Sequence, residues 1–278
     1  MTTTTEAEAG PLRPSAIARA VWSLVWPIVV AVVLVVIGWM VFLRIYAVDP
    51  SVGKTPAAVW QYLFDGPDAA DNRHTVFGAL GITLRDAALG YAGGILTALV
   101  LAVLFVVFAS VEQAFMPIVM LLRSVPLVAM TPVILLAFGR GAAGIAVIGG
   151  VVVFFPALVN IVFGLRSTSR QATDLVLAYG GSRLTVIRKV ALPSALPALF
   201  ASARIAVPAA LIGALVAEWL ATGGGIGGGI QNAIGAFDYG QVWSDIVLLT
   251  GISLLIYTCV GVAESVVLAA YGTRTGRG

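Results

Sequence analysis

Long uncharged apolar runs separated by short polar segments dominate the chain. Four runs carry no Asp, Glu, Lys or Arg between their bounding charges: 19–44, 86–112, 140–166 and 245–264. A helix needs about 20 apolar residues to cross the hydrocarbon core of a bilayer. Two further apolar segments, at about 115–138 and 195–220, carry charged residues inside them. The pattern therefore predicts an all-α membrane protein with about six transmembrane helices.

Composition supports this prediction. Of the 278 residues, 60% are hydrophobic and only 10% are charged, and the mean hydropathy is +1.02. A soluble globular domain is about 25% charged, so this chain could not form a surface compatible with water. The formal net charge of +3 reflects basic residues beside the apolar runs. It gives no indication of a nucleic-acid partner.

The basic residues predict the orientation in the membrane. If the N-terminus is cytoplasmic, the inside segments hold Arg13, Arg19, Arg166, Arg170, Arg183, Arg188, Lys189, Arg274 and Arg277. The outside segments hold only Arg44, Lys54, Arg73 and Arg140. Cytoplasmic loops of membrane proteins carry the excess of Lys and Arg. We therefore expect a multi-pass protein of a bacterial-type cytoplasmic membrane, with both termini in the cytoplasm.

Few residues could carry catalysis, a disulfide or a metal. Cys259 is the only cysteine, and His74, the only histidine, lies in a polar segment expected to be a loop. No zinc-protease or nucleophile-elbow motif occurs, which argues against a membrane enzyme. The first apolar run lacks a small-residue cleavage site, so it is expected to be a retained span. A secondary transporter or channel stays open as an alternative.

The chain is predicted to divide into a cytoplasmic, disordered tail at 1–20, a first span with an external segment at 21–78, a transmembrane core at 79–271 and a second tail at 272–278. Within the external segment we expect a short helix at about 56–64, followed by a turn-rich connector, DGPDAADNR. The glycine-rich run 222–230 lacks the lysine of a phosphate-binding loop. We expect it to be a flexible external loop.

Prolines and buried charges single out the third and fifth spans. Pro117, Pro126 and Pro132 predict either a broken, pore-lining third span or a kinked packing helix. Charged residues within a membrane face protein or water. Arg123 and Glu218 are therefore candidates for a substrate path or for a structural ion pair, and Asn160 for the path or a hydrogen bond between helices. Arg204 is expected to snorkel to the boundary.

The segment between the fourth and fifth spans, 166–197, is the longest polar-containing connection predicted to face the cytoplasm. Its pattern predicts a first helix at about 171–179, ended by Gly180 and Gly181. Ser182 is expected to cap a second helix that runs to Leu192, before Pro193. Leu184, Val186, Ile187, Val190 and Ala191 form its apolar face, opposite Thr185, Arg188 and Lys189.

This segment resembles the EAA loop of binding-protein-dependent ABC permeases, whose pattern is Glu-Ala-Ala, a glycine and a closing Ile-x-Leu-Pro. Asp174, Leu175 and Val176 stand at the acidic triplet, and Gly180 stands at the glycine. Val190 stands at the isoleucine and is followed by Leu192 and Pro193. The chain from about 83 to 269 also resembles the branch that serves sulfonates, taurine, nitrate and pyrimidine precursors, through LLRSVPLVAMTPVILLAFGRG and VAEWLATGGGIGGGI.

The resemblance implies the fold and partners of a type I ABC importer permease. The expected coupling-loop residues, which would contact the ATPase, are Asp174, Ala178, Gly180, Ser182, Arg188, Leu192 and Pro193. A pair of ATPase subunits would bind ATP and Mg²⁺, so that this chain would hold no cofactor and would not itself be an enzyme. The resemblance further implies a permease homodimer and an extracytoplasmic solute-binding protein that delivers a small solute.

Overall fold

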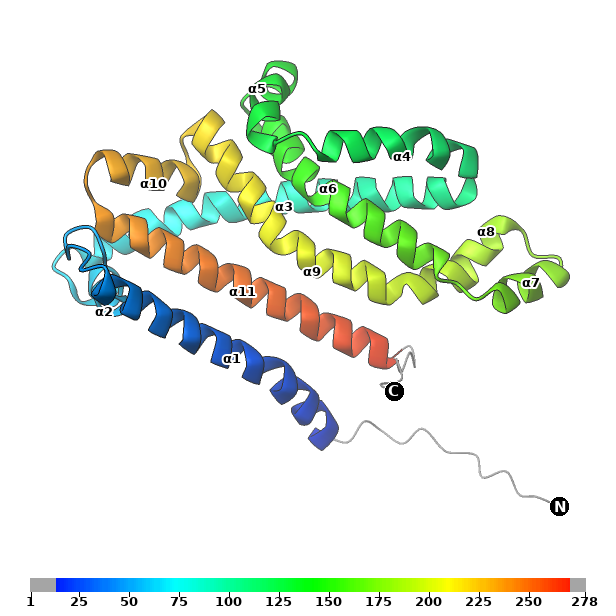
Figure 1. Ribbon diagram of the computed structural model, residues 1–278, viewed down its shortest axis with the longest axis horizontal. Coiled ribbons are helices and arrows are strands. Elements are labelled where there is room, and N and C mark those ends of the chain that lie inside the picture. The colour runs from blue at the N-terminus through cyan, green and yellow to red at the C-terminus, as the bar shows by residue number, and fades with distance from the viewer. Residues whose placement is uncertain (1–13, 271–278) are drawn as a thin grey trace. The chain divides into compact units, whose positions relative to one another are not determined.

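The computed structural model of the protein describes residues 14–270, and the regular elements in that range are helices (Figure 1). The helices include five that are long and apolar enough to cross a membrane, or six if a bent pair counts as one span. This confirms the predicted all-α fold with about six transmembrane helices. The chain divides into two compact units, Met1–Pro56 and Ala57–Gly278.

The first unit contains one long helix, α1 (Pro14–Ile45). This helix begins within the predicted 1–20 tail, while residues 1–13 and the predicted tail at 272–278 lie outside the described residues. After α1 the chain turns through 49–53, where Asp49 accepts a hydrogen bond from the Ser51 amide at 2.8 Å. Hydrogen bonds from Ser51 lower the pKa of Asp49, so the turn favours the ionised carboxylate.

The short helix predicted at about 56–64 is present as α2 (Pro56–Trp60), which begins at the boundary of the two units, and the π-helical turn η1 (Gln61–Asp65). The Tyr62 hydroxyl donates to Asp238 Oδ2 at 2.8 Å, which joins η1 to the start of the last helix. Burial and this hydrogen bond raise the pKa of Tyr62 well above its ordinary value, so the hydroxyl keeps its donor proton.

The turn-rich connector predicted after η1 is mostly helical, because α3 (Ala69–Val107) begins inside it. His74 therefore lies on a helix and not on a loop. The Arg73 guanidinium donates to the Leu63 carbonyl at 2.8 Å, and the Asn72 amide donates to the Tyr62 carbonyl at 3.0 Å. These polar residues, which suggested a loop, satisfy the end of η1 from the first turns of α3.

Three helices form the centre of the second unit: α3, α6 (Ala142–Arg166) and α9 (Leu192–Ala217), which contact one another pairwise. Their buried side chains combine small residues with a few large ones, among them Ala98, Phe105, Leu158, Ile161 and Ala195. The last helix, α11 (Tyr239–Ala270), packs against α9 and α3. At 39 residues, α3 extends about 58 Å and so exceeds the roughly 30 Å hydrocarbon core.

The central helices approach most closely at Gly149 of α6. A Cβ atom added to Gly90 of α3 would lie 2.7 Å from the Gly149 Cα atom, and one added to Gly213 of α9 would lie 2.6 Å from the same atom. Lipid tails are as apolar as leucine, so membrane helices associate largely through close packing and hydrogen bonds. The glycines therefore allow three backbones to meet at one point.

The third predicted span is broken. It consists of α4 (Ala109–Arg123) and α5 (Leu127–Phe138), which are bent by 110° relative to each other. Pro126 stands at the N-cap of α5, and its ring disfavours helical backbone at the preceding residue, Val125. Of the two alternatives that the prolines left open, the broken helix is the one present.

The glycine-rich run predicted to be a loop is also largely helical. After α9 the chain passes through the π-helical turn η3 (Glu218–Thr222) and enters α10 (Gly225–Gly235), which packs against α3, α9 and α11. A Cβ atom at Gly227 would lie 2.6 Å from the Leu215 carbonyl oxygen. The prediction of a flexible loop was wrong because these glycines provide close packing.

Arg204, which was predicted to snorkel to the boundary, has its partners within the protein. The guanidinium donates to Glu264 at 2.9 Å and to the Tyr257 hydroxyl at 3.1 Å, and it lies 4.7 Å from the centre of the Tyr257 ring. Gly261 leaves room for it, since a Cβ atom there would lie 3.4 Å from the guanidinium carbon. The ion pair joins α9 to α11 in a partly buried setting.

The contact at Gly149 predicts a site-specific cost for an added methyl group. Gly213→Ala should lower the free energy of unfolding by about 1–3 kcal/mol, because the backbone of α6 must shift. Gly93→Ala on α3 is the matched control, since a Cβ atom there meets nothing within 4 Å, and alanine favours helix by about 1 kcal/mol. Thermal unfolding of the detergent-solubilised protein would measure both. Equal shifts would contradict the close-packing explanation.

The Arg204 ion pair predicts energetic coupling between α9 and α11. Arg204→Gln and Glu264→Gln should each lower stability by about 1–3 kcal/mol, because each leaves a charged partner partly buried. The double variant should lose less than the sum of the single variants. A double-mutant cycle on the unfolding transition measures this difference, and additive losses would show that the pair is not coupled.

Candidate functional site

The segment that sequence analysis singled out forms two short helices at one end of α9, α7 (Arg170–Ala178) and α8 (Arg183–Val186) (Figure 1). Neither helix contains a buried residue. Asp174, Ala178, Gly180, Ser182 and Arg188 are exposed. Of the predicted coupling-loop residues, only Leu192 and Pro193 are half-buried, at the start of α9. The segment is thus a surface element held by the two helices on either side of it.

Local hydrogen bonds give this segment a defined shape. The Ser169 side chain accepts from the Ala172 amide at 3.1 Å and caps α7. At the other end, Gly180 has a φ of +79°, and the Gly181 amide donates to the Val176 carbonyl at 2.9 Å. This is the Schellman pattern of a glycine-terminated helix. The Ser182 side chain then accepts from the Thr185 amide at 3.3 Å, so the predicted glycine stop and serine cap are both confirmed.

The predicted end of the second helix at Leu192 was wrong. From α8 the chain continues through a π-helical turn, η2 (Ile187–Ala191), directly into α9. The Leu192 amide donates to the Ile187 carbonyl, five residues back. Pro193 then stands in the first turn of α9, where its missing amide hydrogen is not required. A helical path therefore runs from Arg183 to Thr222.

The face of α8 and η2 that was predicted to be apolar packs only in part. Ile187 and Ala191 are buried against the bundle, and Arg188 and Lys189 are exposed, as predicted. Leu184, which was placed on the packed face, is 58% exposed. With Leu175, Leu177 and Tyr179 it completes a set of exposed large apolar side chains beside basic residues. Such a set on a polar segment is typical of an interaction surface.

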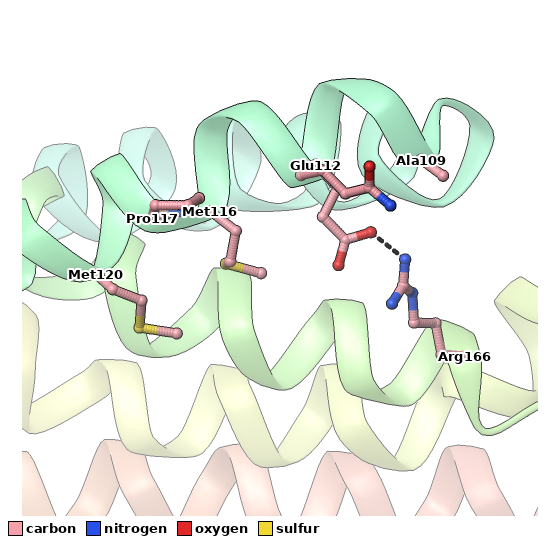
Figure 2. A pocket seen from close by; sticks show the side chains of 7 residues that line it. Ala109, Glu112, Met116, Pro117, Met120 and Arg166 are labelled. Carbon is pink, nitrogen blue, oxygen red and sulfur yellow. Dashed lines mark hydrogen bonds and ion pairs between the residues drawn. The ribbon is translucent and has the colours of Figure 1, made fainter.

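A cleft of about 490 Å³ lies between α4 and the end of α6. Figure 2 shows Glu112 of α4 and Arg166 of α6 reaching toward each other across it, where they form an ion pair. The lining residues are Ala109, Glu112, Gln113, Met116, Pro117, Met120 and Arg166. Arg166 is the last residue of α6, so this ion pair ties α4 to the helix that leads into α7.

The predicted path residues do not come together in this cleft. Arg123 is exposed in the last turn of α4, next to the break before α5. Asn160 is half-buried on α6, and its side chain makes no hydrogen bond within the described part of the chain. Glu218 is fully buried at the opposite end of α9 from η2. Arg123 and Glu218 form no ion pair among residues 14–270.

Glu218 is held by polar partners that sequence reasoning missed. Its Oε2 atom accepts from the Thr83 hydroxyl at 2.9 Å and from the Gly227 amide at 2.8 Å. Thr83 is fully buried on α3. Nothing in the spacing of Thr83 and Glu218, 135 residues apart, indicates this contact. The only signal was the presence of polar residues in otherwise apolar spans.

The described residues contain no cluster of three or more His, Cys, Asp or Glu side chains arranged to hold a metal ion. The exposed site features are instead a capped two-helix segment, a broken span and a cleft between them.

Comparison with known proteins gives the family. Residues 90–270 match the family described as binding-protein-dependent transport system inner membrane component. A probable ABC transporter permease protein of Haemophilus influenzae is 30% identical over 78% of this chain and 89% of its own length. The formylaminopyrimidine transport permease protein ThiX of Halalkalibacterium halodurans is 31% identical over 69% of this chain and 77% of its own length.

Other relatives are named as permeases for different solutes. The riboflavin transport system permease protein RibX of Chloroflexus aurantiacus is 33% identical over 55% of this chain and 57% of its own length. Relatives that are 27–28% identical are named as permeases for nitrate, aliphatic sulfonates and taurine. The family match spans more than half of the chain and includes α4 to α11. The chain therefore belongs to the binding-protein-dependent transport system inner membrane components, and it is a permease subunit of an ABC importer.

Proposed function

We propose that the capped segment α7–α8 is the contact through which a separate ATPase subunit drives this permease. The observation that carries the proposal is that both helices of the segment are capped by serine side chains and yet contain no buried residue. Exposed Leu175, Leu177 and Tyr179 provide apolar contact area, and Arg188 and Lys189 provide charge at its edge. A partner that covers this set would remove large apolar side chains from water.

The rest of the assembly follows from the family. A pair of ATPase subunits would bind ATP and Mg²⁺ and close on nucleotide binding, and two copies of the permease would carry one segment each. A solute-binding protein would deliver the cargo from outside. The excess of basic residues at the α7–α8 end supports a cytoplasmic location for this segment and for both termini.

The broken span supports a role for α4–α5 at the translocation path. Membrane helices that break in the hydrocarbon region leave backbone groups that protein or water must satisfy, so such breaks commonly line cavities. Arg123 lies at this break, and its charge would attract an anionic solute. The assignment of Asn160 and Glu218 to the translocation path stays a prediction.

The cargo is proposed to be a small solute of the kinds named for the relatives. Nitrate, aliphatic sulfonates and taurine carry an anionic group, whereas formylaminopyrimidine and riboflavin are heterocycles. The exposed arginine at the break of the third span favours the anionic class. A secondary transporter or channel, the alternative class, would need no ATPase contact.

The coupling proposal predicts loss of ATPase capture when α7–α8 is altered. Asp174→Lys reverses an exposed charge, and Gly180→Leu places a side chain on a backbone with a φ of +79°. Both variants should insert into the membrane at normal levels. They should retain less than about a tenth of the parent's ATPase capture, because losing about 1.4 kcal/mol of binding reduces affinity tenfold. Affinity purification of the tagged permease from cells that also produce the ATPase measures this.

Gly139→Leu is the matched control for Gly180→Leu. Gly139 has a φ of +78° at the end of α5, and, like Gly180, it has nothing within 4 Å of an added Cβ atom. The control places the same side chain on a glycine with a similar φ away from α7–α8, and it should capture the ATPase normally. Normal capture by Asp174→Lys and Gly180→Leu would refute the coupling role of α7–α8.

The path proposal predicts a charge-dependent effect at Arg123. Arg123→Gln should weaken uptake of the anionic solutes about tenfold, because a hydrogen bond to a charged group contributes about 1.5–3 kcal/mol. Uptake of labelled nitrate, taurine, riboflavin and formylaminopyrimidine by cells producing the complete importer would measure it. Arg140→Gln, another exposed arginine on the far side of α5, is the control. Equal uptake by the Arg123→Gln and Arg140→Gln variants would count against the path assignment.

A further inference from the structure

The first turn of α10 has no side chain of its own with which to cap its amides. Gly224 stands at the N-cap, and Gly225, Ile226, Gly227 and Gly228 follow. The first amides of a helix lack partners within the helix, and a Ser, Thr, Asp or Asn side chain at the N-cap usually accepts from one of them. This helix has no such residue at its start. Its amides are nevertheless buried.

Two side chains from distant parts of the chain supply the missing acceptors. The Ile226 amide donates to Thr83 Oγ1 of α3 at 2.8 Å, and the Gly227 amide donates to Glu218 Oε2 of η3 at 2.8 Å. Thr83 and Glu218 also bond to each other at 2.9 Å. All of these bonds are buried. A carboxylate at a helix N-terminus also interacts favourably with the helix dipole.

The glycines at the start of α10 leave free the space that the Glu218 side chain occupies. A Cβ atom at Gly225 would overlap the carboxyl group, and one at Gly227 would lie 2.9 Å from Glu218 Cβ. The second carboxyl oxygen, Oε1, is buried and has no hydrogen-bond partner in the described residues. A buried carboxyl group with an unpaired oxygen is costly. The hydrogen bonds of the carboxyl group are therefore made through Oε2, to the Gly227 amide of α10 and the Thr83 hydroxyl of α3.

These contacts fasten α10 to two different helices. Thr83 belongs to α3, and Glu218 directly follows α9 in the helical path that begins at Arg183. The other end of that path is α8, which we proposed as part of the ATPase contact. Figure 1 shows α8 and α10 at opposite ends of α9.

We infer that Glu218 and Thr83 are positioning residues that hold α10 to the end of α9 and to α3, so that movement of α9 is passed on to α10. The attachment of α10 to α3 and to the end of α9 is inferred from the hydrogen bonds described above. The transmission of movement from α9 to α10 rests on the proposed function of α7–α8. The two parts are tested separately.

Access to a cysteine on the packed side of α10 tests the fastening. Ala233 of α10 is buried, and Ala233→Cys is made in a Cys259→Ala background so that the new thiol alone can react. The membrane-permeant reagent N-ethylmaleimide is applied to isolated membranes, which makes the result independent of orientation. Thr83→Val and Glu218→Ala should each raise the labelling rate about fivefold or more, because each removes a helix cap.

Conservative variants separate positioning from general damage. Thr83→Ser and Glu218→Gln keep an acceptor atom and should label close to the parental rate. Thr131→Val is the matched control for Thr83→Val, because Thr131 is equally buried but bonds only to Leu127 within its own helix. If Thr83→Val labels no faster than Thr131→Val, or if Thr83→Ser labels as fast as Thr83→Val, the inference is overturned.

The effect of nucleotide on the labelling rate tests whether movement of α9 is transmitted to α10. In membranes that contain the permease with its ATPase, ATP and vanadate should change the labelling rate of the Ala233→Cys parent, and this change should be lost in the Thr83→Val and Glu218→Ala variants. A change retained in both variants, or absent from the parent, would overturn the transmission. ATPase capture is measured on the same samples. Its failure would contradict the proposed function, whereas the labelling rates without nucleotide report on the fastening alone.

Discussion

The structure depends on the close approach of three backbones at Gly149. In water, burial of large apolar side chains would bring helices together, but in lipid the surroundings are as apolar as the helices. Contact between backbones then depends on removing side chains where the helices cross. Gly90, Gly149 and Gly213 do so for α3, α6 and α9. The rest of the second unit is arranged around these helices, because α11 packs on α9 and α3, and α10 contacts α3, α9 and α11.

A second constraint is the continuity of the path from α8 to η3. Four prolines, Pro193, Pro197, Pro208 and Pro156, lie in α9 and α6 without breaking them. In contrast, Pro126 coincides with a 110° bend between α4 and α5. Pro193 occupies the first turn after η2, whereas Pro126 stands at the N-cap of a new helix. The unbroken path gives the permease an element that extends from its exposed two-helix segment to the buried carboxyl group of Glu218.

Polar groups within the spans are used to join helices. Arg204 and Glu264 join α9 to α11, and Thr83 and Glu218 join α3 and η3 to α10. Sequence analysis assigned Arg204 to the membrane boundary and left Arg123 and Glu218 as candidates for a substrate path or an ion pair, because only the presence of a charge could be read from the sequence. The partner of each charge comes from a span far away in the chain. The caps at Ser169 and Ser182, by contrast, could be predicted because each cap and its amide lie three residues apart.

The sequence by itself determined the number and approximate limits of the spans, the glycine stop at Gly180, the family and the absence of a nucleotide-binding motif. These properties depend on local composition and spacing. Only the tertiary structure decided that the glycines of 222–230 form a packed helix, that Pro193 lies within a continuous helical path, and that Thr83 faces Glu218. Glycine permits both a flexible loop and a close contact, and which of the two occurs depends on whether another backbone or side chain occupies the space that a Cβ atom would fill.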